Sequence, residues 1–427
     1  MLFGMKSSVL VVCLVFGGAA SSIAQEACSK PIEGKSAATV ASLRKQLRAI
    51  TLNKDDVGTD VPELAQRLIS QLKSALAQTA QAVVACHDGA ADTKTVEREM
   101  ATLLHANPPQ PPPNATVYKG DPRYPEWLSD EYGSNLLVTV DQPRPQLLSL
   151  EFQFHIECGD DTVWMLFEQQ GSHWRERLIW QAPPYKEISG AFGDFFVTAI
   201  LPESSSDGWR VVAAHGRPWC TSRFSGFNID VLAPTDDPEH PRVVWHTERD
   251  YSRGDYNTRL SSSGDTFELR LHDDEMHFDM DAFERLVVYR YRVSGDKVIR
   301  LEPIAANARG FVEEWLSMPW EEALAQSDTA QADKLRAVHK EYEISFKGTG
   351  EYTSWHSGPV QACTTHDHFQ VTMTTERERI VPGKPGGEST PGSTYLFQLQ
   401  QDNGYRLLKI TTTPDPSCAG PDLMKKP

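Results

Sequence analysis

Hydrophobic and polar residues alternate with a period of two over much of residues 136–304 and again over 351–414. The alternation is clearest at Leu148, Leu150, Phe152, Phe154 and Ile156. This period is typical of β-strands with one buried face. Polar turns separate the strands, so the pattern predicts four antiparallel units of about four strands each. The predicted strands are Leu148–Ile156, Val163–Phe167 and Leu178–Trp180, after an entry near Leu136; then 195–201, 209–214, 226–232 and 243–247; then 256–261, 266–271, 285–292 and 297–301; and finally 351–355, 369–374, 394–399 and 405–411.

The hairpin that closes each unit is its most regular part. Its last strand begins with a basic residue and two aliphatic residues, at Arg177–Trp180, Arg242–Trp245, Lys297–Arg300 and Arg406–Lys409. Repeated four-stranded units are the pattern of β-propeller blades. An antiparallel meander or sandwich is the alternative, because hairpins with polar turns occur in those folds too. The fold class is therefore mainly β and antiparallel, with a propeller-like or meander/sandwich body.

Helical periodicity appears in two places, as an N-terminal α-helical module and as a helical insertion. Leu43 and Leu47 share one helix face, and a second helix is predicted after Asp60 and Pro62. A third helix is expected from Asp92 onward. The insertion, at 309–342, separates the third β unit from the fourth.

The N-terminus predicts a signal peptide. Lys6 precedes an apolar run over 9–16, and Ser22-Ile23-Ala24 fits cleavage between small residues. An uncleaved anchor is the alternative. We expect a secreted or periplasmic protein with no integral membrane segment after cleavage. The expected domains are the signal peptide 1–24, the helical module 25–106, a Pro-rich linker 107–126, the β-rich body 127–304, the helical insertion 305–345 and a C-terminal β unit 346–427.

Seven cysteines are present, and Cys13 lies inside the signal peptide. An even number in an exported chain favours disulfide bonds. The remaining six fall in pairs along the chain, two in the helical module, two in the central β region and two in the last unit. We predict the disulfide bonds Cys28–Cys86, Cys158–Cys220 and Cys363–Cys418.

The net charge of the chain excludes two classes of partner. The net charge is −16, from 42 basic and 58 acidic residues. Nucleic acid and anionic membrane surfaces require a cationic footprint, so neither is an expected partner.

Two polar clusters are candidate metal sites, for calcium or zinc. The first joins two predicted strands of the third unit and contains His272, Asp273, Asp274, His277, Asp279 and Asp281. Such a density of carboxylates suits a hard cation, and the histidines suit a transition metal. We favour an acidic loop that keeps a sheet edge soluble. The cluster lacks the spacing of an EF-hand and of a His-Glu-x-x-His helix.

The second cluster is His366-Asp367-His368. On a strand, His-x-His would direct both rings to one face, as metal sites require. A polar loop beside the Cys363 disulfide is the interpretation we favour. Six tryptophans of the first two units could stack on carbohydrate, but most lie in apolar runs, which indicates core packing.

No catalytic motif is specific enough to assign a reaction. The preferred function is a non-catalytic exported binding or assembly protein, with an unknown protein or carbohydrate partner. The alternative is an extracytoplasmic hydrolase, perhaps metal-dependent, that uses the two clusters. They would have to meet in one cleft for that function.

Overall fold

The computed structural model describes most of residues 30–424. The segments it leaves out within this range are 51–60, 88, 90–91, 113–115, 117–122, 124–130, 157–158, 183–194, 203–207, 217–223, 253–257, 277–281, 303, 306, 346–350 and 380–387. The predicted signal peptide, Cys28, and the pair Cys158 and Cys220 lie outside the described residues.

Sixteen strands are described, in four sheets that each contain four antiparallel strands in chain order. Sheet A contains β1 (Leu137–Arg144), β2 (Leu147–Ile156), β3 (Gly159–Gln170) and β4 (His173–Gln181). Sheet B contains β5 (Phe196–Leu201), β6 (Arg210–Gly216), β7 (Phe224–Ala233) and β8 (Arg242–Ser252). Sheet C contains β9 (Arg259–Ser263), β10 (Thr266–Met276), β11 (Ala282–Ser294) and β12 (Lys297–Leu301). Sheet D contains β13 (Glu351–Ala362), β14 (His368–Arg379), β15 (Glu388–Gln401) and β16 (Tyr405–Thr411).

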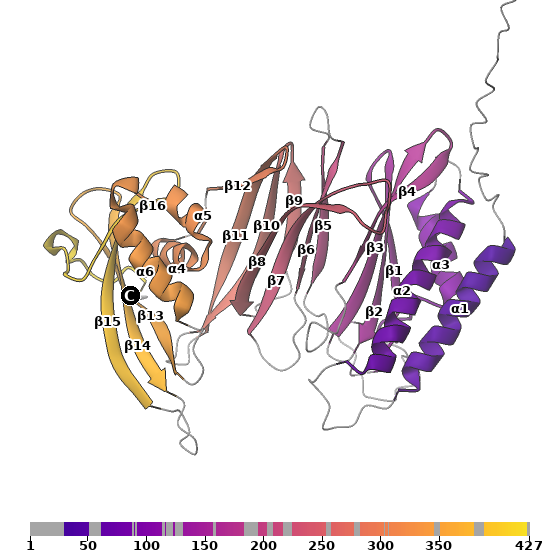
Figure 1. Ribbon diagram of the computed structural model, residues 1–427, viewed down its shortest axis with the longest axis horizontal. Helices are drawn as coiled ribbons and strands as arrows, with labels where there is room; N and C mark the ends of the chain where they lie inside the picture. Colours follow the sequence, from indigo (N-terminus) through magenta and orange to yellow (C-terminus); the bar gives the residue numbers. More distant parts are fainter. Residues whose placement is uncertain are drawn as a thin grey trace, which may run out of the picture.

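The predicted mainly β, antiparallel fold class is confirmed, and each predicted unit is one meander sheet. Sheets A, B and C stack face to face (Figure 1). Residues of sheets A and B share one core, and residues of sheets B and C share another. The first strands of the three sheets also meet at one backbone oxygen. The carbonyl of Ile200 accepts hydrogen bonds from Arg144 Nη2 at 3.0 Å and Ser262 Oγ at 3.0 Å. The first strands of sheets A, B and C therefore lie together at one edge of the stack, and this arrangement is propeller-like.

Three helices cover the free face of sheet A. They are α1 (Lys30–Arg48), α2 (Glu63–Val84) and α3 (Thr93–Leu104), and their buried side chains belong to the same core as sheet A. A buried ion pair adds to this packing, with 2.8 Å between Lys73 Nζ and Asp161 Oδ2. Lys73 belongs to a Ser-x-x-Lys sequence, and its role here is structural.

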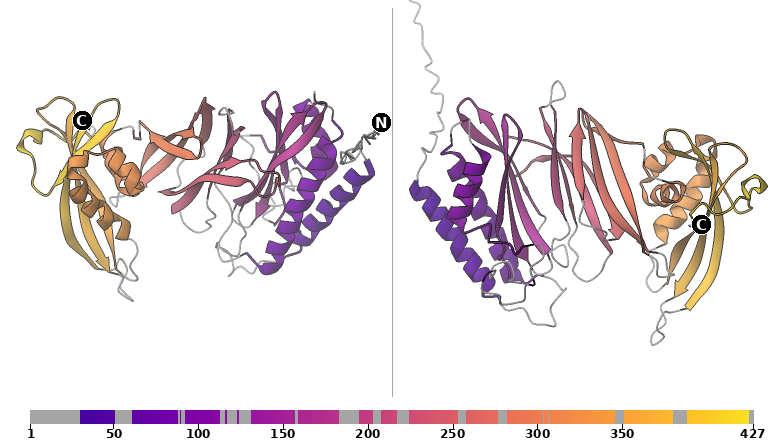
Figure 2. Two further views of the ribbon diagram at one scale, coloured as in Figure 1. Left: turned by 45° about the horizontal axis from the view of Figure 1, so that its top comes forward. Right: turned by 180° about the vertical axis from the view of Figure 1, so that it is seen from behind.

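A second helical group, the predicted insertion, precedes sheet D. It contains α4 (Ala308–Ser317), α5 (Trp320–Ala325), the 3-10 helix η2 (Thr329–Gln331) and α6 (Ala332–Ile344). Together with sheet D these helices form a third core, built around Phe311, Trp315 and Phe397. Sheets A and D lie at opposite ends of the molecule, with α4–α6 between sheets C and D (Figures 1 and 2). The four sheets form an open row, and they do not close into a ring.

The predicted disulfide bond Cys363–Cys418 is confirmed, and Cys86 is also disulfide-bonded. The first bond holds the C-terminal segment on sheet D. Thr364 N–H donates to the carbonyl of Ser417 at 2.8 Å, and Leu423 N–H donates to the carbonyl of Val360 at 2.8 Å. None of the helices in the described part of the chain has both the length and the apolarity needed to cross a membrane.

Candidate functional site

The first predicted metal cluster begins on a strand. β10 extends to Met276 and pairs with Ala282 at the start of β11, so both strands are longer than the alternation predicted. Continued backbone pairing explains the difference, because a ladder does not require apolar side chains. His277, Asp279 and Asp281 lie outside the described residues, and so do the side chains of His272, Asp273 and Asp274.

The second cluster lies where a turn enters β14: His366 and Asp367 belong to the turn, and His368 is the first residue of the strand. His366 lies between β13 and β14, and Asp367 has a φ of 58°. This left-handed residue reverses the chain, which removes the shared face that a strand would give. His366 Nδ1 contacts Asp367 Oδ2 at 2.5 Å, and the side chain of His366 is 92% exposed. The segment is the polar turn beside the Cys363 disulfide that we favoured.

The structure does not bring these two segments together. β10 and β11 belong to sheet C, the His366 turn belongs to sheet D, and α4–α6 lie between the two sheets (Figure 1). Among the described residues, no group of three or more histidine, cysteine, aspartate or glutamate side chains has an arrangement that could hold a metal ion.

A different polar group lies on sheet B, and we call it the histidine row: His215, Asp230, His246 and Glu248. Cross-strand pairing of β6, β7 and β8 aligns its members. The distance from His246 Nδ1 to Asp230 Oδ1 is 2.7 Å, and from His246 Nε2 to Glu248 Oε1 it is 3.2 Å. His215 Nε2 approaches the other oxygen of Asp230 at 3.3 Å. The row therefore places one carboxylate between two imidazoles.

Burial differs along the row. The side chain of His215 is 5% exposed and lies against Trp180 of sheet A, with 4.8 Å between ring centroids. His246 is 43% exposed. Burial raises the pKa of Asp230, but hydrogen bonds from His215 and His246 outweigh it, and the net pKa is lowered. Burial lowers the pKa of His246, but its bonds to Asp230 and Glu248 outweigh it, and the net pKa is raised. The row thus favours an accessible imidazolium beside a buried carboxylate.

We expect Asp230→Asn to lower the pKa of His246, because a neutral amide stabilises the imidazolium less than a carboxylate does. An NMR titration of the imidazole carbon-bound protons measures this directly. The raised pKa of His246 stabilises the fold fully below the ordinary histidine pKa of about 6.5, and this contribution is lost as the pH rises through the raised value. The lowered pKa of Asp230 stabilises the fold above the ordinary carboxyl range, and that contribution is lost as the pH falls through the lowered value.

The stability difference between wild type and Asp230→Asn should therefore be larger near about pH 6 than near about pH 8. Asp236→Asn is the control, since Asp236 is an exposed aspartate outside the row. If His246 keeps the same pKa in Asp230→Asn, the coupling between these two groups is disproved.

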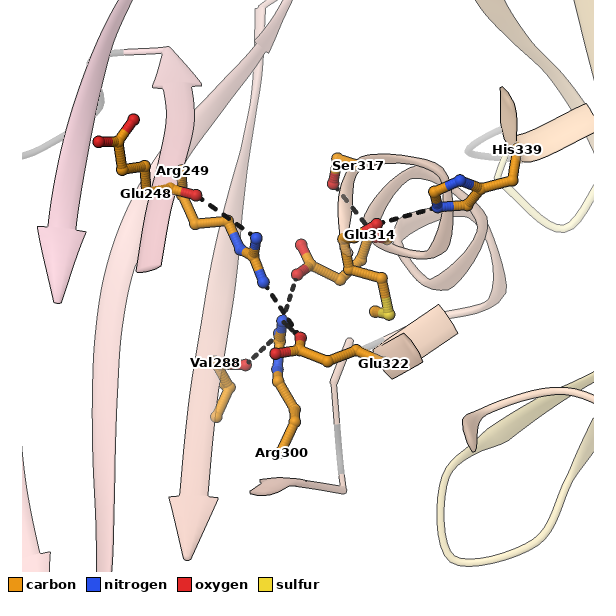
Figure 3. A network of polar contacts seen from close by, with 9 residues as sticks. Glu248, Arg249, Val288, Arg300, Glu314, Ser317, Glu322 and His339 are labelled. Atoms are coloured by element: carbon orange, nitrogen blue, oxygen red, sulfur yellow. Dashed lines mark hydrogen bonds and ion pairs between the residues drawn. The ribbon is translucent and has the colours of Figure 1, made fainter. Parts of the chain in front are cut away.

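A second polar group joins sheets B and C to the helical insertion, and we call it the arginine–glutamate network: Arg249, Arg300, Glu314 and Glu322 (Figure 3). Arg300 Nη1 lies 2.7 Å from Glu314 Oε1, and both side chains are almost fully buried. Arg249 Nη2 lies 3.1 Å from Glu322 Oε2. The four residues come from β8, β12, α4 and α5, so the network connects three parts of the fold.

Aromatic rings and a backbone oxygen complete the surroundings of Arg300. Its guanidinium carbon lies 4.5 Å from the ring centroid of Tyr289, and Nη2 donates to the carbonyl of Val288 at 3.2 Å. Burial lowers the pKa of Arg300, but the Glu314 carboxylate and its neighbours outweigh it, and the net pKa is raised. Burial raises the pKa of Glu322. A charged arginine held in this way is a structural anchor, because its two terminal nitrogens are directed to protein groups.

The sequence contained a signal for this network. The fourth position of the closing strand is Trp180, Trp245, Arg300 and Lys409 in sheets A to D, and Arg300 is buried whereas Lys409 is exposed. A guanidinium in place of an indole at a core position requires a buried partner. Glu314 likewise interrupts the apolar face that Phe311 and Trp315 define on α4. The histidine row gave a weaker signal, because only strand register brings its members together.

The tryptophans mostly pack in cores, as the apolar runs predicted. Trp164, Trp174, Trp180 and Trp209 are buried in the core that sheet A shares with α1–α3 and sheet B. They are therefore not a stacking surface for carbohydrate.

Comparisons with known proteins give little further information. No protein-family model matches the chain, and no curated protein sequence matches it significantly. Among solved structures, the chain is similar to an α-L-arabinofuranosidase from Fusarium graminearum in complex with an iminosugar inhibitor, at 11% identity and a TM-score of 0.23, covering 61% of this chain and 62% of that one. It is also similar to an α-L-arabinanase from Cellvibrio cellulosa complexed with arabinohexaose, at 11% identity and a TM-score of 0.22, covering 64% and 77%. A mutant of that arabinanase gives 11% identity and a TM-score of 0.21, covering 65% and 78%.

Proposed function

We propose that the protein is a non-catalytic, exported binding or assembly protein, and that the outer face of sheet C is its partner surface. The supporting observation is the pattern of burial through the stack. β6 is buried at all seven positions, so sheet B is covered on both faces. In β10, Phe267, Leu269 and Leu271 are buried, whereas the residues between them are more exposed. Sheet C is therefore covered by sheet B on one face, and its other face, on the side of α4–α6, keeps exposed side chains such as Arg270 and Arg292.

The two outer faces of the stack formed by sheets A, B and C differ in how they are covered. The free face of sheet A is covered by α1–α3, as capping units cover the ends of other stacked folds. On the outer face of sheet C, Ile299 has 56% of its surface exposed. Ile299 is one position that a partner bound to this face would contact, and it is therefore the position tested below.

Ile299→Asp is expected to weaken partner binding by at least about tenfold, which corresponds to about 1.4 kcal/mol. The measurement is retention on an array of immobilised polysaccharides and secreted proteins. Val243→Asp is the matched control, because Val243 is also an aliphatic residue on an edge strand and is also 56% exposed. The proposal fails if both variants are retained as strongly as wild type.

The alternative function is hydrolysis, which the exposed His246 beside buried Asp230 favours. Incubation of the protein with neutral and acidic oligosaccharides, peptides and esters tests it, with and without calcium or zinc. We expect no product. Turnover that His246→Ala abolishes would replace the binding proposal with the hydrolase. Metal content and the thermal shift on adding a chelator test the metal-dependent version.

A further inference from the structure

Strand register places a group of cations on the open face of sheet C, and we call it the arginine face. Alternate residues of the sheet point toward sheet B, among them Phe267 and Tyr291. The positions between them point outward. The charged side chains described on that outward face are Arg259, Glu268, Arg270, Arg290, Arg292 and Lys297.

Five of these six charges are positive, although the whole protein has a net charge of −16. Arg259 and Arg270 are directly opposite each other in the β9–β10 ladder. Like charges in that position destabilise a sheet, so the Arg259–Arg270 pair lowers the stability of the fold. The acidic neighbours offset part of the charge. Arg270 contacts Glu268 at 2.5 Å, and Arg292 contacts Asp265 at 3.5 Å. Among the described side chains of this face, an excess of positive charge remains.

The side chains of Arg270 and Arg292 are each 52% exposed, so both guanidinium groups are open to a ligand. Screening over about 8–10 Å at physiological salt lets this local charge act independently of acidic groups elsewhere on the protein. Guanidinium groups recognise carboxylates through paired, parallel hydrogen bonds. The arginine face is therefore suited to an anionic ligand with several carboxylates.

The remaining residues on the face distinguish between classes of ligand. Ser261, Ser263 and Thr266 lie in the same cross-strand rows as the arginines. No aromatic side chain is described on this face, whereas protein interfaces depend on buried aromatic anchors. Duplex nucleic acid is a phosphate polyanion, and the test below includes it as the competing class of ligand. Hydroxyl and guanidinium groups together match the carboxylates and hydroxyls of an acidic sugar chain.

We propose that the arginine face binds a carboxylate-bearing polysaccharide, an inference that rests on the proposed function and gives the chemistry of its partner. The test is affinity electrophoresis of the full-length protein through gels that contain polygalacturonate or neutral galactan. Polygalacturonate should retard the wild type, and galactan should not. Raising the salt from about 50 to 200 mM should weaken the retardation, as expected for ionic contacts.

The variant Arg270→Ser/Arg292→Ser should bind polygalacturonate at least about tenfold more weakly, as expected when charge-assisted hydrogen bonds are lost. The matched control is Arg175→Ser/Arg379→Ser, which removes two exposed arginines from sheets A and D. It should bind like wild type. Thermal unfolding of both variants confirms that they are folded, since exposed substitutions change stability little.

Three results would overturn the inference: no retardation of wild type, equal loss in both variants, or equally strong retardation by DNA or an acidic protein. The Ile299→Asp test of the proposed function is read separately. If Ile299→Asp loses array binding while polygalacturonate does not retard wild type, the binding surface stands and the ligand class is wrong.

Discussion

Glu314→Ala is expected to lower the free energy of unfolding by about 3–5 kcal/mol, because it leaves the buried guanidinium of Arg300 without its main counter-charge. The Arg300 and Glu314 side chains are only 2% and 1% exposed, so water cannot replace the lost carboxylate. Glu322 Oε2 lies 3.8 Å from Arg300 Nη1 and compensates only in part. Urea unfolding followed by tryptophan fluorescence measures the loss, since Trp315 is adjacent in α4.

The matched control is Glu351→Ala, which breaks the Arg379–Glu351 pair. The two side chains of that pair lie 3.7 Å apart and are 67% and 76% exposed, so its loss should cost less than about 1 kcal/mol. The double variant Arg300→Met/Glu314→Leu should be far more stable than Glu314→Ala, because no unpaired charge stays buried. Equal losses in Glu314→Ala and Glu351→Ala would show that the Arg300 pair is not an anchor.

This network explains why the row of sheets holds together beyond sheet C. The cores of sheets A–C and of the α4–α6 and sheet D unit are separate clusters. Arg249 and Arg300, from sheets B and C, meet the two glutamates of α4 and α5 between them (Figure 3). Charged contacts require particular geometry, whereas apolar contacts do not. The network therefore defines how the helices sit on the outer edges of sheets B and C.

The strands could be predicted from the sequence because burial alternates along them. Fifteen of the observed strands overlap predicted segments, and the entry near Leu136 corresponds to β1. Boundaries were less accurate where polar residues continue a ladder, as in β10, which runs through an acidic segment to Met276. His366 lies in the polar turn that we favoured, but the left-handed conformation of Asp367 has no periodic signature in the sequence.

The candidate sites depended on contacts that periodicity does not encode. Asp230 and His246 are adjacent only because β7 and β8 pair in one register. A shift of β8 by one residue would move His246 to the opposite face from Asp230. The arginine face has the same origin, since Arg259 and Arg270 belong to different strands. The order of the sheets in the stack decides which sheet faces are covered and which are exposed, and periodicity does not encode that order.

Removing the Cys363–Cys418 disulfide with Cys363→Ser/Cys418→Ser is expected to lower the free energy of unfolding of sheet D by about 4 kcal/mol. The bond joins residues separated by 55 positions, so it restricts the unfolded chain considerably. Chain-entropy arguments for a closed loop of that length give the stated magnitude. In the folded state the bond also holds the segment that contains Ser417 on sheet D.

Urea unfolding of the wild type with and without reductant, and of the double serine variant, measures this contribution. The double serine variant should unfold at a urea concentration well below that of the oxidised wild type. Reductant also breaks the disulfide bond of Cys86, so any further loss on reducing the variant measures other disulfide bonds and not Cys363–Cys418. Asp422→Ala is the control for the segment itself, because Asp422 Oδ1 accepts the backbone N–H of Val360 at 3.0 Å. It should cost only about 1 kcal/mol. If Asp422→Ala destabilises as much as loss of the disulfide, the stabilisation arises from docking of the C-terminal segment, and restriction of the unfolded chain is not its source.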